Sequence, residues 1–150
     1  MRILVMLALW AAMFPAKTGG PDFSGTWKYN PDKTTAHRAW TGDTVVVVRQ
    51  SGQQISFDYY SGHENFAHES YTTDGKERPL YKTKTETAYA RAHWEKSELQ
   101  IATQHVYDAQ GTQESTDVDR WLLADGGKTL VNQLSDGKKV VFDKVNESGH

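Results

Sequence analysis

Six histidines are the residues with the most obvious chemical potential, because an imidazole can bind a metal or transfer a proton near neutral pH. His93 and His105 lie in stretches that we expect to pair as adjacent strands, but this pairing puts them on opposite faces. No H-E-x-x-H motif and no H-x-H spacing occurs in the sequence. We therefore expect solvated histidines and no metal site. His105 alone should point inward, where it would bond a backbone carbonyl or serve as the polar partner of a ligand.

Catalytic chemistry has little support in the sequence. There is no cysteine, and no serine lies in a G-x-S-x-G motif. Neither a P-loop nor a dinucleotide-binding glycine pattern occurs. The acidic residues are expected in turns or on outward strand positions, which favours solvated carboxylates over a glycosidase pair; examples are Asp58, Asp74, Asp125 and Asp136. We expect a protein that is not an enzyme, with no catalytic residues and no cofactor.

The first sixteen residues differ in composition from the rest of the chain. Met1-Arg2 is basic, residues 3–14 are almost wholly apolar, and Pro15-Ala16 precedes a polar run. This order is typical of a secretory signal peptide, and the apolar run is well short of the roughly 20 residues that span a bilayer. We expect cleavage after Ala16, a secreted or periplasmic protein, and no membrane span after cleavage. Without cysteine, neither a lipid-modified N-terminus nor a disulfide can form.

The chain after residue 16 has the composition of one ordinary globular domain. Removal of residues 1–16 takes away one arginine and no acid, which leaves 16 basic and 19 acidic residues. The two signs are interspersed, with no basic run that would favour nucleic acid. No repeat or low-complexity linker divides residues 17–150, so we expect a single domain there.

Alternating patterns and turn signals predict about nine strands and no helix. The Ser51-Gly52 turn signal joins strands at 44–50 and 53–60, and it would set Val46 opposite Phe57. Because alternate residues share a face, Phe57 and Tyr59 should point inward. Residues 31–43 are expected to form a polar connection, and residues 74–80 an exposed loop ended by a proline.

Later stretches extend the same meander. The Lys96-Ser97 turn would pair Trp94 with Leu99 and Ala88 with His105. Trp121 is the inward choice in the strand at 115–123, and the hairpin at Asp136-Gly137 has apolar residues on both faces. We expect the antiparallel meander to close into an all-β barrel of eight to ten strands, because closure removes exposed edges. A two-sheet sandwich is the alternative.

One resemblance supports this architecture. Gly25-Thr26-Trp27 resembles the G-x-W opening strand of the lipocalin and fatty-acid-binding barrels, the calycin-like group. Residues 71–77, the Trp94-to-Leu99 hairpin and residues 119–130 resemble small exported bacterial lipocalin-like domains of unassigned function. The resemblance implies an arginine packed over the opening tryptophan, and Arg120 is the matching position. The Arg-x-Tyr that ends fatty-acid-binding proteins is absent.

These expectations lead to two functional hypotheses. In the first, the chain is a non-catalytic exported binding module for a small apolar or aromatic ligand inside the barrel. Its ligand-binding residues would be Trp27, Phe57, Tyr59, Trp94, His105, Arg120 and Trp121. In the second, the same aromatic residues fill the barrel, and a solid domain of the bacterial envelope acts through rim loops at 31–43, 61–65 and 74–82, with an exposed patch around Trp40. The oligomeric state is not predicted by the sequence.

Overall fold

The structure is a computed structural model that describes residues 19–108 and 113–146. The expected signal peptide at 1–16, the turn around Gly111 and His150 lie outside these ranges. The strands are β1 (Gly25–Tyr29), β2 (Thr44–Ser51), β3 (Gln54–Ser61), β4 (Glu64–Thr72), β5 (Arg78–Lys82), β6 (Glu86–Glu95), β7 (Glu98–Tyr107), β8 (Gln113–Ala124), β9 (Thr129–Gln133) and β10 (Lys139–Lys144). One turn of 3-10 helix, η1 (Asp125–Gly127), is the sole helical element among the described residues.

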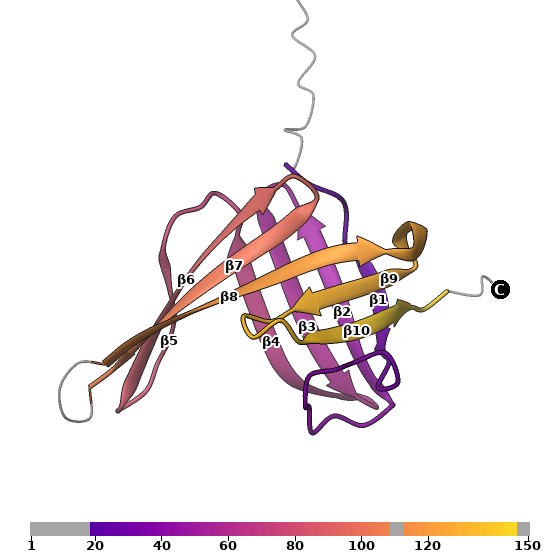
Figure 1. Ribbon diagram of the computed structural model, residues 1–150, viewed down its shortest axis with the longest axis horizontal. Coiled ribbons are helices and arrows are strands. Elements are labelled where there is room, and N and C mark those ends of the chain that lie inside the picture. Colours follow the sequence, from indigo (N-terminus) through magenta and orange to yellow (C-terminus); the bar gives the residue numbers. More distant parts are fainter. Residues whose placement is uncertain (1–18, 109–112, 147–150) are drawn as a thin grey trace, which may run out of the picture.

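The ten strands form one antiparallel sheet that curls into an open barrel, which confirms the expected all-β meander (Figure 1). The first and last strands of the chain are neighbours in the sheet, because β1 pairs with β10 on one side and with β2 on the other. The edge strands β4 and β5 are not paired with each other. The connection between them instead reaches β6, where Gly75 N–H donates to the Ala92 carbonyl at 2.8 Å. In the described part of the chain, no helix is long and apolar enough to cross a membrane.

The expected turn between β2 and β3 is displaced by one residue, so the predicted register is wrong. The two-residue loop is Gly52-Gln53, and Val46 lies opposite Tyr59 instead of Phe57. Gly52 has a φ of +58°, which suits the first position of such a turn. The register therefore slips by two residues, and a slip of two preserves which face each side chain occupies. Phe57 and Tyr59 are buried as expected.

The β6–β7 hairpin has the predicted register, whereas the prediction of an exposed loop before it was wrong. Trp94 pairs with Leu99 and Ala88 with His105. Residues 78–82, expected as part of an exposed loop, form the edge strand β5. A proline is tolerated at an edge because the missing N–H faces no partner there. Pro79 occupies this position, and the ladder with β6 shifts register between Pro79 and Tyr81.

A solid apolar core fills part of the barrel. The largest fully buried side chains include Trp27, Phe23, Phe57 and Phe142. The Trp27 indole N–H donates to the Phe23 carbonyl at 2.9 Å, and the Phe23 ring lies edge-on to Trp94 at 5.1 Å between centroids. The last hairpin is now oriented, because Phe142 and its ladder partner Leu130 are both fully buried. Trp27 of the first strand therefore lies at the centre of the core.

A glycine is needed at position 25 because of its backbone conformation, and not because a side chain there would clash with its neighbours. Its φ is +143°, whereas a Cβ added there would meet only ordinary contacts at 3.7 Å or more. We expect Gly25→Ala to lower the free energy of unfolding by about 1–3 kcal/mol, the usual cost of a non-glycine residue in such a conformation. Gly42→Ala is the matched control, because a Cβ at Gly42 meets nothing within 4 Å and its φ is ordinary. Equal urea midpoints for the two variants would contradict this assignment.

Candidate functional site

A cavity of about 650 Å³ lies beside the core and opens at one end of the barrel. Its wall lies at the end of the barrel where β3, β7 and β9 finish, and the connection between β1 and β2 completes this wall. Aromatic and charged side chains share the lining, among them Trp40, Tyr59, Glu69, Asp119 and Trp121. The interior of the barrel is thus filled by side chains at one end and hollow at the other.

The inward face of β7 and β8 changes from apolar to polar toward the cavity. Directly opposed residues of an antiparallel pair share a face. Leu99 opposes Trp121 in the buried core, and the next inward pair is Ile101 with Asp119. Beyond these, Thr103 opposes Asp117. Small and polar residues therefore replace large apolar ones where the cavity begins, and the core cannot fill that end.

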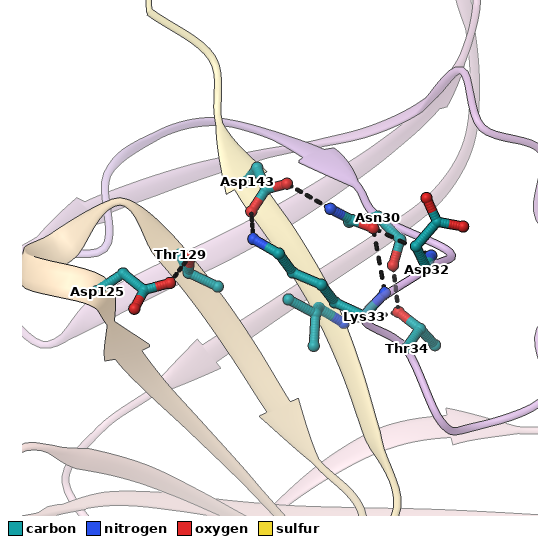
Figure 2. A network of polar contacts seen from close by, with 8 residues as sticks. Asn30, Asp32, Lys33, Thr34, Asp125, Thr129 and Asp143 are labelled. Carbon is teal, nitrogen blue, oxygen red and sulfur yellow. Dashed lines mark hydrogen bonds and ion pairs between the residues drawn. The ribbon is translucent and has the colours of Figure 1, made fainter.

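The connection at residues 30–43 brings two further side chains to the cavity, Arg38 and Trp40. Its start is fastened to β10, as Figure 2 shows: Asn30 Nδ2 donates to Asp143 at 2.6 Å and Lys33 Nζ lies 3.1 Å from the same carboxylate. The Asn30 hydrogen bond in particular holds the pKa of Asp143 below its usual value. Thr34 Oγ1 accepts from the Val141 N–H at 3.0 Å. These bonds hold the connection against the barrel.

Aromatic rings converge around Trp40 on the cavity wall. Its ring lies 5.5 Å from that of Tyr59 and 6.3 Å from that of Phe66 between centroids. The Arg38 guanidinium lies over the Trp40 ring at 5.6 Å. At the floor, the Trp121 ring lies 4.5 Å from the Phe57 ring and 3% of Trp121 is exposed. Aromatic side chains therefore form part of both the wall and the floor of the cavity.

Carboxyl groups on opposite walls have altered proton affinities. Burial raises the pKa of Glu69, and the negative charge of Asp119 raises it further. Burial likewise raises the pKa of Asp119, with a contribution from the neighbouring Asp117. Arg38 lowers both pKa values but does not outweigh burial. Burial also raises the pKa of Tyr59 and of Tyr71, whose hydroxyl donates to Glu69 at 3.3 Å.

The raised pKa of Glu69 predicts a pH-dependent stability. The folded chain holds this proton more tightly than the unfolded chain, so stability falls as pH rises from the ordinary glutamate value of 4.5 through the raised value. Glu69→Gln keeps an acceptor for Tyr71 and removes the charge. We expect it to increase the urea midpoint at pH 7 and to leave the midpoint unchanged at pH 4. Glu64→Gln, exposed on the same strand, is the control; a gain by Glu69→Gln that is equal at both pH values would contradict the prediction.

His105 lies at the rim of the cavity. One hypothesis from the sequence gave it a backbone carbonyl as partner, but its partners among the described residues are side chains. Its Nδ1 lies 2.5 Å from Glu86 Oε1, and its Nε2 lies 3.4 Å from Asp117 Oδ2. Hydrogen bonds from Tyr81 and from His105 lower the pKa of Glu86. The Tyr107 ring stacks on the imidazole at 6.2 Å with an interplanar angle of 13°. The inward orientation expected for His105 is therefore observed, with carboxylates as its partners.

The seven residues expected to bind a ligand fall into three groups. Tyr59, His105 and Trp121 line the cavity. Trp27 and Phe57 belong to the core away from the cavity. Trp94 is partly buried against that core and lies beside Gly20. Arg120 is exposed on the outer face, 3.9 Å from Glu98. The cation over Trp27 is Lys144, whose Nζ lies 5.5 Å from the ring centroid, so the match of Arg120 to this role is wrong.

Sequence reasoning missed the carboxylates of the cavity, although a signal for two of them was present. Asp117, Asp119 and Trp121 are alternate residues of one strand and therefore share a face, so an inward Trp121 implies that both aspartates point inward as well. Glu69 gives no comparable signal, because its strand has few apolar residues. Arg38 and Trp40 lie in an irregular connection whose path no periodicity predicts.

Within the described ranges, no three His, Asp or Glu side chains are grouped as a metal ion would require. The sequence was also compared with known proteins. No family model matches the chain, and no curated protein matches it either.

Proposed function

We propose that this chain is a non-catalytic binding module that holds a small molecule with an apolar or aromatic body in the barrel cavity. The observation that supports this proposal most directly is the cavity of about 650 Å³ beside a filled core. Ligand sites in proteins typically have volumes of about 300–1,000 Å³ and combine apolar walls with a few polar groups. The rings of Trp40, Tyr59 and Trp121 supply such walls. A calycin-like exported carrier is the class of protein that this proposal describes.

The rival role, a solid domain that acts through its rim loops, receives less support. That role expected an exposed apolar patch around Trp40. Trp40 itself is half-buried and lies against Tyr29, Tyr59 and Phe142, with ring centroids 5.5 to 6.1 Å apart. The exposed ring beside it is that of Phe66. The connection at 30–43 thus directs its tryptophan toward the cavity, which favours the binding role.

Filling the cavity should abolish binding without unfolding the protein. Ala67 lines the cavity from β4, and Ala67→Trp would place an indole in the space. We expect the wild-type chain to bind 4-phenylbutanol with one-to-one stoichiometry in isothermal titration calorimetry, and Ala67→Trp to bind none. Ala102→Trp, on the opposite face of β7, is the matched control and should bind as the wild type does.

A native mass spectrum of the purified chain provides an independent readout. We expect a bound mass of a few hundred daltons on the wild-type protein and none on Ala67→Trp, since ligands of this size fit such cavities. Equal binding of 4-phenylbutanol by Ala67→Trp and Ala102→Trp would place the site elsewhere. No bound mass together with no heat of binding for the wild type would refute the proposed function.

A further inference from the structure

We infer that the molecule held in the cavity carries an organic cation, an ammonium or amidinium group, which Glu69 and Asp119 bind together with the amide oxygen of Asn132. This inference rests on the proposed binding function and specifies its ligand class. Three independent features of the cavity support it: its charge, an unpaired buried acceptor and its aromatic rings.

The charged groups of the lining are predominantly negative. Glu69, Asp117, Asp119 and Asp136 carry four negative charges, whereas Arg38 carries the one fixed positive charge. The fixed charges of these lining residues, four negative and one positive, therefore sum to −3. This negative charge would repel an anionic ligand and attract a cationic one.

Arg38 compensates the two partly buried carboxyl groups only in part. Its guanidinium lies over the Trp40 ring at 5.6 Å, and its Nε is buried without a hydrogen-bond partner among the described residues. The pKa values of Glu69 and Asp119 remain raised in spite of its charge, because burial has the larger effect. A cationic ligand would add to the effect of Arg38 on these two carboxyl groups.

Asn132 supplies the observation that is independent of the acidic groups. It lines the cavity from β9, and its ladder partner is the inward residue Trp121. Only 9% of Asn132 is exposed, and its Oδ1 accepts no hydrogen bond within the part of the chain that the structure describes. A buried acceptor without a donor is unfavourable, and such groups usually have a partner. A ligand N–H group is a donor that would satisfy it.

The aromatic walls favour the same charge. The rings of Trp40, Tyr59 and Trp121 line the cavity, and an aromatic ring can attract a cation. A metal ion is a poorer occupant, because no three ligating side chains of the described residues are grouped to hold one. A compact nitrogen cation on an apolar body satisfies the carboxylates, the amide oxygen and the rings together.

The test compares three probes with one apolar body, 4-phenylbutylammonium, 4-phenylbutanol and 4-phenylbutyrate, by isothermal titration calorimetry on the full chain at pH 7. We expect the ammonium to bind at least about tenfold more tightly than the alcohol, because a hydrogen bond to a charged group is worth more than a neutral one. The carboxylate should bind most weakly of the three.

Two variants test the named carboxylates. Glu69→Gln and Asp119→Asn should each reduce the ratio of ammonium affinity to alcohol affinity by about tenfold. Glu64→Gln removes the same charge from an exposed position on β4, outside the cavity, and should change neither affinity. Thermal unfolding of each variant without ligand verifies that it is folded.

The outcomes separate this inference from the proposed function. If the alcohol binds and the ammonium binds no more tightly, the cavity binds small molecules but the cation inference is wrong. The same conclusion follows if Glu64→Gln weakens the ammonium as strongly as Glu69→Gln does, because the effect would then be long-range charge only. If none of the three probes binds, both the inference and the proposed function fail.

Discussion

Trp27→Ala should lower the free energy of unfolding by about 3–5 kcal/mol, the range for truncation of a buried tryptophan. The side chain is 1% exposed and lies within the core cluster. Its removal leaves a void that the sheet cannot collapse into, and it deprives the Phe23 carbonyl of the indole N–H that donates to it at 2.9 Å. Urea unfolding followed by circular dichroism measures the effect.

Trp27→Phe separates packing from hydrogen bonding at this position. It keeps most of the apolar volume but leaves the buried Phe23 carbonyl without its donor, so a loss of about 1–3 kcal/mol is expected. If Trp27→Ala unfolds at the urea concentration of the wild type, Trp27 does not lie at the centre of the core that we describe.

Trp121→Ala should have two effects at once, because the residue belongs to both the core and the cavity. Its ring lies 4.5 Å from the Phe57 ring and 6.1 Å from the Phe142 ring, and it lines the cavity floor. We expect a loss of about 3–5 kcal/mol in the free energy of unfolding. We also expect loss of 4-phenylbutanol binding, since the floor that the ligand contacts is removed. Urea unfolding and calorimetry measure the two effects separately.

Trp40→Ala provides the contrast to this prediction. Trp40 is half-buried and lies in the connection between β1 and β2, outside the solid core. Its truncation should weaken binding while it costs less stability than Trp121→Ala, because less apolar surface is taken from a buried environment. If the two variants lose equal stability, the division into a filled end and a hollow end is wrong.

The strand faces were predictable from the sequence because alternation is a local property of extended chain. The β2–β3 hairpin illustrates this: the predicted turn was displaced, yet the register slipped by two residues and Phe57 and Tyr59 stayed inward. The β5 strand was not predictable in the same way. Pro79 argues against a strand by itself, and an edge position that tolerates proline is known only once the neighbouring strand is placed.

The candidate site was predicted only in part, since a cavity is made by residues that are distant in sequence. Tyr59, His105 and Trp121 were identified because their strands alternate regularly. Glu69 and Asp119 lie on strands that are not neighbours in the sheet, and only curvature brings them to one cavity. The tests of ligand charge are therefore directed at residues that the barrel assembles.

By itself, the sequence determined an antiparallel meander with Trp27 in its core, because period-two alternation and turn residues act over a few positions. Only the tertiary structure decided which end of the barrel is filled, where Arg38 and Trp40 lie, and that Lys144 rather than Arg120 covers Trp27. The physical reason is the sequence separation over which the determining interactions act. Strand pairing is specified by local pattern, whereas the curl of a sheet and the path of a connection depend on contacts between segments far apart in the chain.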